Sequence, residues 1–194
     1  MNHLDAINAG IAAKTPYNEI VRKVFLTFPT QAFVGLEDQQ YAILNEVSEY
    51  FRVPITSVQV TGSAKLGRSL HKRTDFCPGE SDLDIAIIDT QLFVNYMELV
   101  LRKSKGYSDR SAFPLREGQS TQDEYTRYLA RGIFRPDLMP TGPERANWQD
   151  FFGRQSRIYS KLFRSISAAI YISQACFEVK QRSSIRNHAE NRPL

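Results

Sequence analysis

The chain has 194 residues, of which 42% are hydrophobic and 24% are charged, with a formal net charge of +4. These proportions are typical of a globular protein and exclude wholesale disorder, and the length fits one domain spanning residues 1–194. No apolar run approaches the ~18–20 residues that cross a bilayer, and the N-terminus lacks the basic and apolar segments of a secretory signal. We therefore expect a cytoplasmic protein without a membrane partner.

The N-terminal part, residues 1–53, is predicted to be helical. Apolar residues recur there at helical spacing, first around Ile7 and again around Ile20. A further helix is expected over about 37–52, and it ends before Pro54 because the residue preceding a proline disfavours helical geometry.

The pattern then changes to that of a motif-bearing core at residues 57–90. Residues 57–62 alternate apolar and β-branched with polar positions, and residues 81–89 pass from alternation into an apolar run. Both patterns predict β-strands. Between them we expect a short helix in the segment GSAKLGRSL and a polar loop over residues 71–80.

The remainder is predicted to be mixed. A helix with Thr90 as its N-cap follows the core, and residues 107–145 carry four prolines that predict an irregular insertion around one helix. The elements expected here are helices at 121–131, 147–163 and 174–188 and a strand within 165–173, SISAAIYIS.

Gly62 and Ser63 close the first strand of the core, and Asp82 and Asp84 open the second. Side chains alternate along a strand, so the two carboxylates share one face, roughly 6.6–7 Å apart. Such a pair can hold Mg²⁺, which takes one or two carboxylates together with substrate phosphates. Gly62 has no Cβ and allows backbone to approach a phosphate closely, while Ser63 offers a hydroxyl. The sequence therefore predicts a phosphate-binding turn beside a metal site.

A strand, a Gly-Ser turn, a helix and then a strand bearing Asp-x-Asp resemble the signature of the polymerase-β-like nucleotidyltransferase superfamily, in particular its minimal bacterial members. The resemblance covers residues 57–90. It implies an α/β (α+β) fold with a small mixed sheet and helices packed on one face, Mg²⁺ as cofactor and an NTP such as ATP as donor. By motif position, Asp82 and Asp84 would be the catalytic and metal-binding residues, and Gly62 and Ser63 would bind the donor phosphates. Four cations that follow the turn could also contact the triphosphate, namely Lys65, Arg68, Lys72 and Arg73. Lys65 and Arg68 are the favoured pair because they belong to the helix that Ser63 opens.

The chain departs from the superfamily pattern in two respects. Twenty positions separate Gly62 from Asp82, so residues 71–80 are interpreted as an inserted loop. Members of the superfamily generally place a third carboxylate on a later strand, but the strand expected within 165–173 contains no acid. Substitute acids could be Glu178, Asp89, Asp137 or Asp150.

The sequence supports two main hypotheses. In the first, the protein transfers a nucleoside monophosphate from an NTP to a protein side chain, an RNA end or a small molecule and releases pyrophosphate. In the second, it is a non-catalytic nucleotide-binding or interaction module of the same fold, for instance in a toxin–antitoxin or phage-defence system. A third, RNA binding, would use a basic stripe predicted on one helix face, Arg154, Arg157, Lys161 and Arg164.

Overall fold

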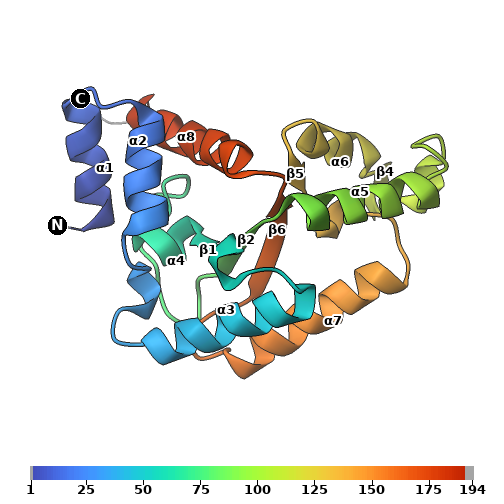
Figure 1. The fold of residues 1–194 in the computed structure, drawn as a ribbon, viewed down its shortest axis with the longest axis horizontal. Helices are drawn as coiled ribbons and strands as arrows, with labels where there is room; N and C mark the ends of the chain where they lie inside the picture. The colour runs from blue at the N-terminus through green and yellow to red at the C-terminus, as the bar shows by residue number, and fades with distance from the viewer. Residues whose placement is uncertain (1, 191–194) are drawn as a thin grey trace.

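The computed structural model describes residues 2–190, and its centre is a four-stranded mixed sheet with the strand order β1-β2-β6-β5 (Figure 1). β1 is antiparallel to β2, β2 is parallel to β6, and β5 is antiparallel to β6. A two-residue hairpin, β3 with β4, lies apart from this sheet. The strands are β1 (Val58–Thr61), β2 (Leu83–Ile88), β3 (Leu115–Arg116), β4 (Gln119–Ser120), β5 (Ile133–Phe134) and β6 (Ile166–Tyr171).

Helices surround the sheet and account for both chain ends. The α-helices are α1 (His3–Ala12), α2 (Tyr17–Val21), α3 (Glu37–Phe51), α4 (Gly62–Leu66), α5 (Thr90–Lys103), α6 (Gln122–Leu129), α7 (Pro143–Ile158) and α8 (Gln174–Glu190). Shorter turns of π or 3₁₀ type are η1 (Arg22–Thr27), η2 (Gln31–Phe33), η3 (Ile55–Ser57), η4 (Arg110–Ala112) and η5 (Pro136–Leu138). In Figure 1, α8 runs back beside α1 and α2.

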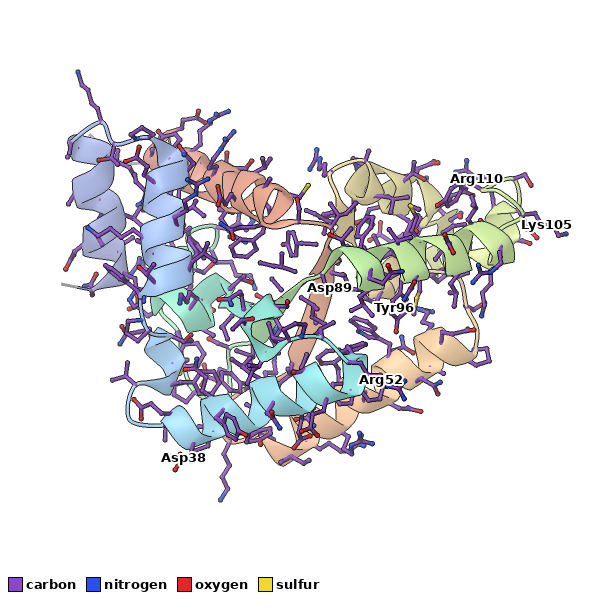
Figure 2. The ribbon with its side chains drawn as sticks, viewed as in Figure 1. Asp38, Arg52, Asp89, Tyr96, Lys105 and Arg110 are labelled. Atoms are coloured by element: carbon purple, nitrogen blue, oxygen red, sulfur yellow. The ribbon has the colours of Figure 1, made fainter. Side chains whose placement is uncertain are left out.

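The larger core lies against one face of the sheet. Alternate residues of β2, namely Leu83, Ile85 and Ile87, point into it and are almost fully buried. They pack with apolar side chains of three helices, α3, α5 and α7. Figure 1 shows these helices below and to the right of the sheet. Within this core, Tyr96 of α5, labelled in Figure 2, makes an edge contact with Trp148 of α7 at 5.4 Å between ring centroids.

A second, smaller core covers part of the opposite face. It contains Ala86 of β2 and Tyr171 of β6 together with apolar residues of α1, α2, η1 and α8, including Phe25 and Phe177. The expectation of helices on one face is therefore incomplete, since the N-terminal helices and α8 also pack on the other. Asp84 belongs to this second face because it lies between the inward-pointing residues Leu83 and Ile85.

Two predicted boundaries are wrong, for local reasons. The helix after β2 is capped by Asp89, whose carboxylate accepts a hydrogen bond from the Leu92 amide at 2.8 Å. Thr90 is already inside the helix, and its hydroxyl donates to the Ile172 carbonyl. The helix predicted at 147–163 begins at Pro143, whose fixed φ suits a first helical position, and ends at Ile158.

The segment 107–145 is less irregular than predicted. It contains β5, which joins the edge of the main sheet by pairing Ile133 with Tyr171 and Phe134 with Ile170. A two-residue strand is too short to show a period in the sequence, and only its pairing with β6 defines it. β5 and the turn η5 that follows it line a cavity that also contains Asp84.

Candidate functional site

The turn from β1 into α4 lies directly against the carboxylate of Asp84. Thr61 pairs with Asp84 across the two strands, and the next residue, Gly62, has a left-handed backbone with φ +67°. A Cβ on Gly62 would lie 2.6 Å from Oδ2 of Asp84, so any larger residue would displace this carboxylate. The left-handed backbone favours glycine here, and the absence of a side chain lets the Asp84 carboxylate lie against the turn.

Asp82 lies just before β2 and is held by a guanidinium. Nε of Arg164 donates to Oδ1 of Asp82 at 3.0 Å, and Nη2 donates to Oδ2 at 2.5 Å. The Ser165 hydroxyl adds a third bond to Oδ1 at 2.7 Å. Although burial alone would raise the pKa of Asp82, these bonds and the charges of Arg164 and Lys72 outweigh it and hold the pKa below its ordinary value.

Asp84 has the opposite electrostatic character. Its side chain reaches solvent, but the surrounding protein removes much of its hydration, which raises its pKa, and the charge of Asp82 raises it further. Nearby Arg135 and Lys72 and a hydrogen bond from Ser167 compensate only in part. Two neighbouring carboxylates thus have pKa values displaced in opposite directions, a pattern that is common at functional sites.

Two cavities meet at Asp84. The first, of about 560 Å³, lies between the β1–α4 turn, the loop after α4 and α8, and it contains Ser63, Lys72, Asp82 and Arg164 in its wall. The second, of about 700 Å³, is bounded by β6, α7, η5 and α8. Their shared lining residues are Gly62, Asp84, Lys180, Gln181 and Ser184. Each volume lies in the ~300–1,000 Å³ range of small-molecule sites.

The predicted loop 71–80 forms part of the first cavity. It is folded back by Arg68, which bonds to the Asp75 carboxylate at 2.7 Å and to the Arg73 carbonyl at 2.5 Å. The loop thereby brings the cation of Lys72 close enough to Asp82 and Asp84 to lower the pKa of each.

Two of the predicted phosphate ligands point elsewhere. Lys65 is 5% exposed, and its ammonium donates to the Phe28 carbonyl at 2.6 Å, so burial lowers its pKa to about 8. Arg68 is used in holding the loop. Lys72, which was also considered as a phosphate ligand, does line the first cavity, together with Arg164 and Lys180.

Three of the substitutes considered for a third carboxylate are positioned away from Asp84. Glu178 is buried against Arg22, and Asp89 caps α5. Asp150 lies on the exposed side of α7. At the register position beside Asp84 on β6 stands Ser167. Within residues 2–190, no group of three or more histidine, cysteine, aspartate or glutamate side chains is arranged to hold a metal ion.

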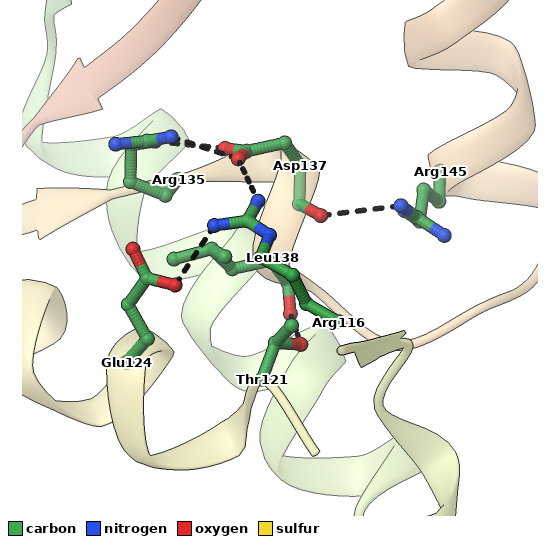
Figure 3. Close-up of polar contacts among 7 residues, drawn as sticks. All are labelled: Arg116, Thr121, Glu124, Arg135, Asp137, Leu138 and Arg145. Atoms are coloured by element: carbon green, nitrogen blue, oxygen red, sulfur yellow. Dashed lines mark hydrogen bonds and ion pairs between the residues drawn. The ribbon is translucent and has the colours of Figure 1, made fainter. Parts of the chain in front are cut away.

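Asp137, the fourth substitute, is at the centre of an arginine cluster beside the second cavity (Figure 3). Arg135 grips its carboxylate with two bonds of 2.7 and 2.8 Å, and Arg116 reaches it at 3.4 Å while bonding Glu124 at 3.0 Å. Arg145 donates to its main-chain carbonyl at 3.1 Å. These arginines neutralise Asp137, and Arg135 in turn stacks over the ring of Tyr128 at 4.9 Å.

The predicted basic stripe is not one helical face. α7 ends at Ile158, so Lys161 and Arg164 lie beyond it. Arg154 remains on the helix, over the ring of Phe151 at 5.7 Å, whereas Arg164 is directed to Asp82. Arg164 reaches Asp82 because β6, which begins two residues later, pairs with the strand bearing Asp84. No local signal in the sequence pointed to Arg164, Arg135 or Lys180.

Comparisons with protein-family models, with curated proteins and with solved structures find no match to this chain. In the part of the chain that the structure describes, no helix is long and apolar enough to cross a membrane. Any assignment of function therefore rests on the geometry around Gly62, Asp82 and Asp84.

Proposed function

We propose that this protein is a Mg²⁺-dependent nucleotidyltransferase that transfers a nucleoside monophosphate from an NTP to an acceptor and releases pyrophosphate. The observation that carries the proposal is the contact between the Gly62 turn and Asp84, at the junction of two cavities. A glycine turn allows phosphates to approach the backbone closely, and a pair of carboxylates beside it suits a divalent cation.

The two carboxylates fit such a cation. The pKa of Asp84 is raised partly by the negative charge of Asp82, so a positive ion between them would relieve an existing repulsion. Asp82 and Asp84 would hold Mg²⁺, which would supply positive charge to the donor phosphates and lower the barrier to displacement at phosphorus. No third acid is needed for binding, because Mg²⁺ commonly takes one or two carboxylates plus substrate phosphates.

The protein's own groups supply the positioning. The first cavity would take the NTP, with Ser63 beside the phosphates and the cations of Lys72, Arg164 and Lys180 around them. The second cavity would take the acceptor, because it reaches Asp84 from the other direction. The acceptor hydroxyl could belong to a protein side chain, an RNA end or a small molecule. Lys65 and Arg68 are not part of this set, since their bonds lie elsewhere.

One observation favours the alternative of a non-catalytic nucleotide-binding or interaction module. Ser167, rather than an acid, lies beside Asp84 on β6. A serine can hydrogen-bond to a carboxylate but cannot accept a proton from an acceptor hydroxyl near neutral pH. In this alternative the protein binds an NTP with Mg²⁺ and does not turn it over.

The decisive experiment incubates the protein with α-³²P-labelled NTPs and Mg²⁺ or Mn²⁺, and measures pyrophosphate release and label transfer to protein, RNA and small-molecule acceptors. We expect label transfer that Asp84→Asn and Asp82→Asn each abolish. Asp150→Asn, which removes an exposed acid from α7, is the matched control and should leave transfer intact.

Binding without turnover would select the alternative. In that case, equilibrium dialysis would show NTP retained in the presence of Mg²⁺ and lost in Asp84→Asn, with no product formed. Ser167→Asp then provides a gain-of-function test, because it places a third acid beside Asp84. Absence of both NTP binding and label transfer in the folded wild type would refute both functions.

A further inference from the structure

Arg164 occupies the carboxylate that a metal ion would need. Its Nε and Nη2 bond the two oxygens of Asp82 at 3.0 and 2.5 Å, and the Ser165 hydroxyl bonds Oδ1 as well. Among the described residues, Asp84 forms no comparable ion pair. The two carboxylates of the candidate site are therefore in different states, one clamped by a cation and one open to the cavity.

The ion pair between Arg164 and Asp82, called the clamp below, can break without disturbing the backbone. The Arg164 side chain is 63% exposed, and ion pairs at such positions are held only weakly because water competes for both partners. Its backbone, by contrast, is fixed, since the Arg164 amide donates to the Ser81 carbonyl and the Leu83 amide donates to the Ser165 carbonyl. Only the side chain would need to move, and it lies in the wall of the first cavity, where the donor phosphates would lie.

We propose that Arg164 is a gate that couples metal binding to nucleotide binding. Without nucleotide, its guanidinium satisfies Asp82 and opposes capture of a free divalent cation. When an NTP enters the first cavity, the guanidinium leaves Asp82 for the phosphate oxygens, which it can grip with the same two-pronged geometry. Asp82 then becomes available to the cation. This inference rests on the proposed function, since it assumes that Asp82 and Asp84 bind a metal together with an NTP.

The gate has a thermodynamic consequence that can be measured without any catalytic assay. Because coupling between two ligands is reciprocal, the nucleotide should tighten metal binding by the same factor by which the metal tightens nucleotide binding. Removing the guanidinium should weaken this coupling, and by the same reciprocity the loss should be equal for both ligands. Without nucleotide, a variant that lacks the guanidinium should bind the metal more tightly than the wild type does. Adding nucleotide should then increase the metal affinity of the variant by a smaller factor than it does in the wild type.

The test measures Mn²⁺ affinity by electron paramagnetic resonance of the free ion, with and without the α,β-methylene analogues of ATP and GTP. Arg164→Gln removes the clamp at an exposed position and should leave the fold intact. We expect it to bind Mn²⁺ alone about two- to fivefold more tightly than the wild type, the range expected for loss of an exposed ion pair. The analogue should then tighten Mn²⁺ binding less than it does in the wild type.

Two further variants separate the clamp from a general effect of charge. Arg157→Gln removes an exposed arginine of α7 that does not line the first cavity, and it should bind Mn²⁺ like the wild type. Arg164→Lys keeps the charge but cannot bond both oxygens of Asp82 in a fork, and it should fall between the wild type and Arg164→Gln. This ordering would support the gate.

Contrary outcomes overturn the gate in distinguishable ways. If Arg164→Gln binds Mn²⁺ no more tightly than the wild type, or Arg157→Gln gains as much, while Asp84→Asn still abolishes binding, the gate is wrong and the metal site stands. If neither the wild type nor Arg164→Gln binds Mn²⁺ with or without an analogue, the proposed function and the gate are both refuted.

Discussion

Replacing the candidate metal ligand Asp84 by asparagine should make the folded protein more stable at neutral pH. The Asp84 carboxylate has a raised pKa because it is partly desolvated and lies near Asp82. A raised pKa means that the folded state disfavours the charged form, and above that pKa the penalty is fully present. An isosteric neutral amide removes it and can still accept a hydrogen bond from Ser167.

The magnitude follows from the strand geometry. Side chains two residues apart are separated by ~7 Å along a strand, and two like charges at that distance in an effective dielectric of ~20 repel by about 2.4 kcal/mol. Arg164 neutralises much of the charge on Asp82, and solvent reaches Asp84, so the net gain should be about 0.5–1 kcal/mol. For a chain of this size, that gain raises Tm by about 1–4 °C.

The assay is thermal unfolding followed by circular dichroism, from pH 7.5 down to pH 4. The advantage of Asp84→Asn should shrink as pH falls through the raised pKa of Asp84, and it would vanish only below the ordinary value of 3.8, where the carboxyl is protonated in both folded and unfolded chains. Asp82→Asn is the internal control of opposite sign. Its pKa is lowered by Arg164 and Ser165, so its loss should reduce stability at neutral pH by up to ~1 kcal/mol.

An Asp84→Asn protein that melts below the wild type at pH 7.5 would refute this reasoning. A Tm difference that stays constant down to pH 4 would also refute it, because the effect would then not arise from the charge. If Asp84→Asn is more stable than the wild type but no longer binds Mn²⁺, Asp84 is a residue that lowers the stability of the unliganded protein and is needed for metal binding.

Three other perturbations probe the surroundings. Gly62→Ala should abolish nucleotide binding, and in urea unfolding it should lower stability more than Gly35→Ala does. Both glycines have a positive φ, but only a Cβ at Gly62 would meet a carboxylate oxygen. Equal losses of stability would contradict this contact. Burial lowers the pKa of Lys65 to about 8, so wild-type stability should rise relative to Lys65→Met between about pH 8 and 10.5, and parallel pH profiles would refute this. Glu178→Gln should lower the stability of the fold, because the amide can still accept a hydrogen bond from Arg22 but loses the charge of the ion pair; the nucleotide affinity should be unchanged. Impaired nucleotide binding would instead indicate that Glu178 belongs to the site.

Much of the core followed from local patterns. β1, β2 and β6 alternate or run apolar over four to six residues, and the turn needs a glycine, so the elements around Asp82 and Asp84 lie within a residue or two of their predicted positions. The choice of Gly62, Ser63, Asp82 and Asp84 as neighbours also came from the sequence, because two strands joined by one connection pair most simply with each other. The favoured phosphate-binding cations, in contrast, have other partners in the structure. Lys65 and Arg68 follow the glycine in sequence, but in the fold one is buried and the other holds the loop.

The sequence by itself determined that two carboxylates would stand at the start of a strand that follows a glycine turn, because the strand depends on a local apolar pattern and the turn on backbone sterics. Tertiary structure decided which side chains meet them. Arg164 and Ser167 come from a segment about eighty positions away and reach Asp82 and Asp84 through the parallel pairing of β2 with β6. Lys180, almost one hundred positions away, joins the wall of the same cavity through the packing of α8. Such contacts have no local period, so they arise only when burial of the apolar faces brings those segments together.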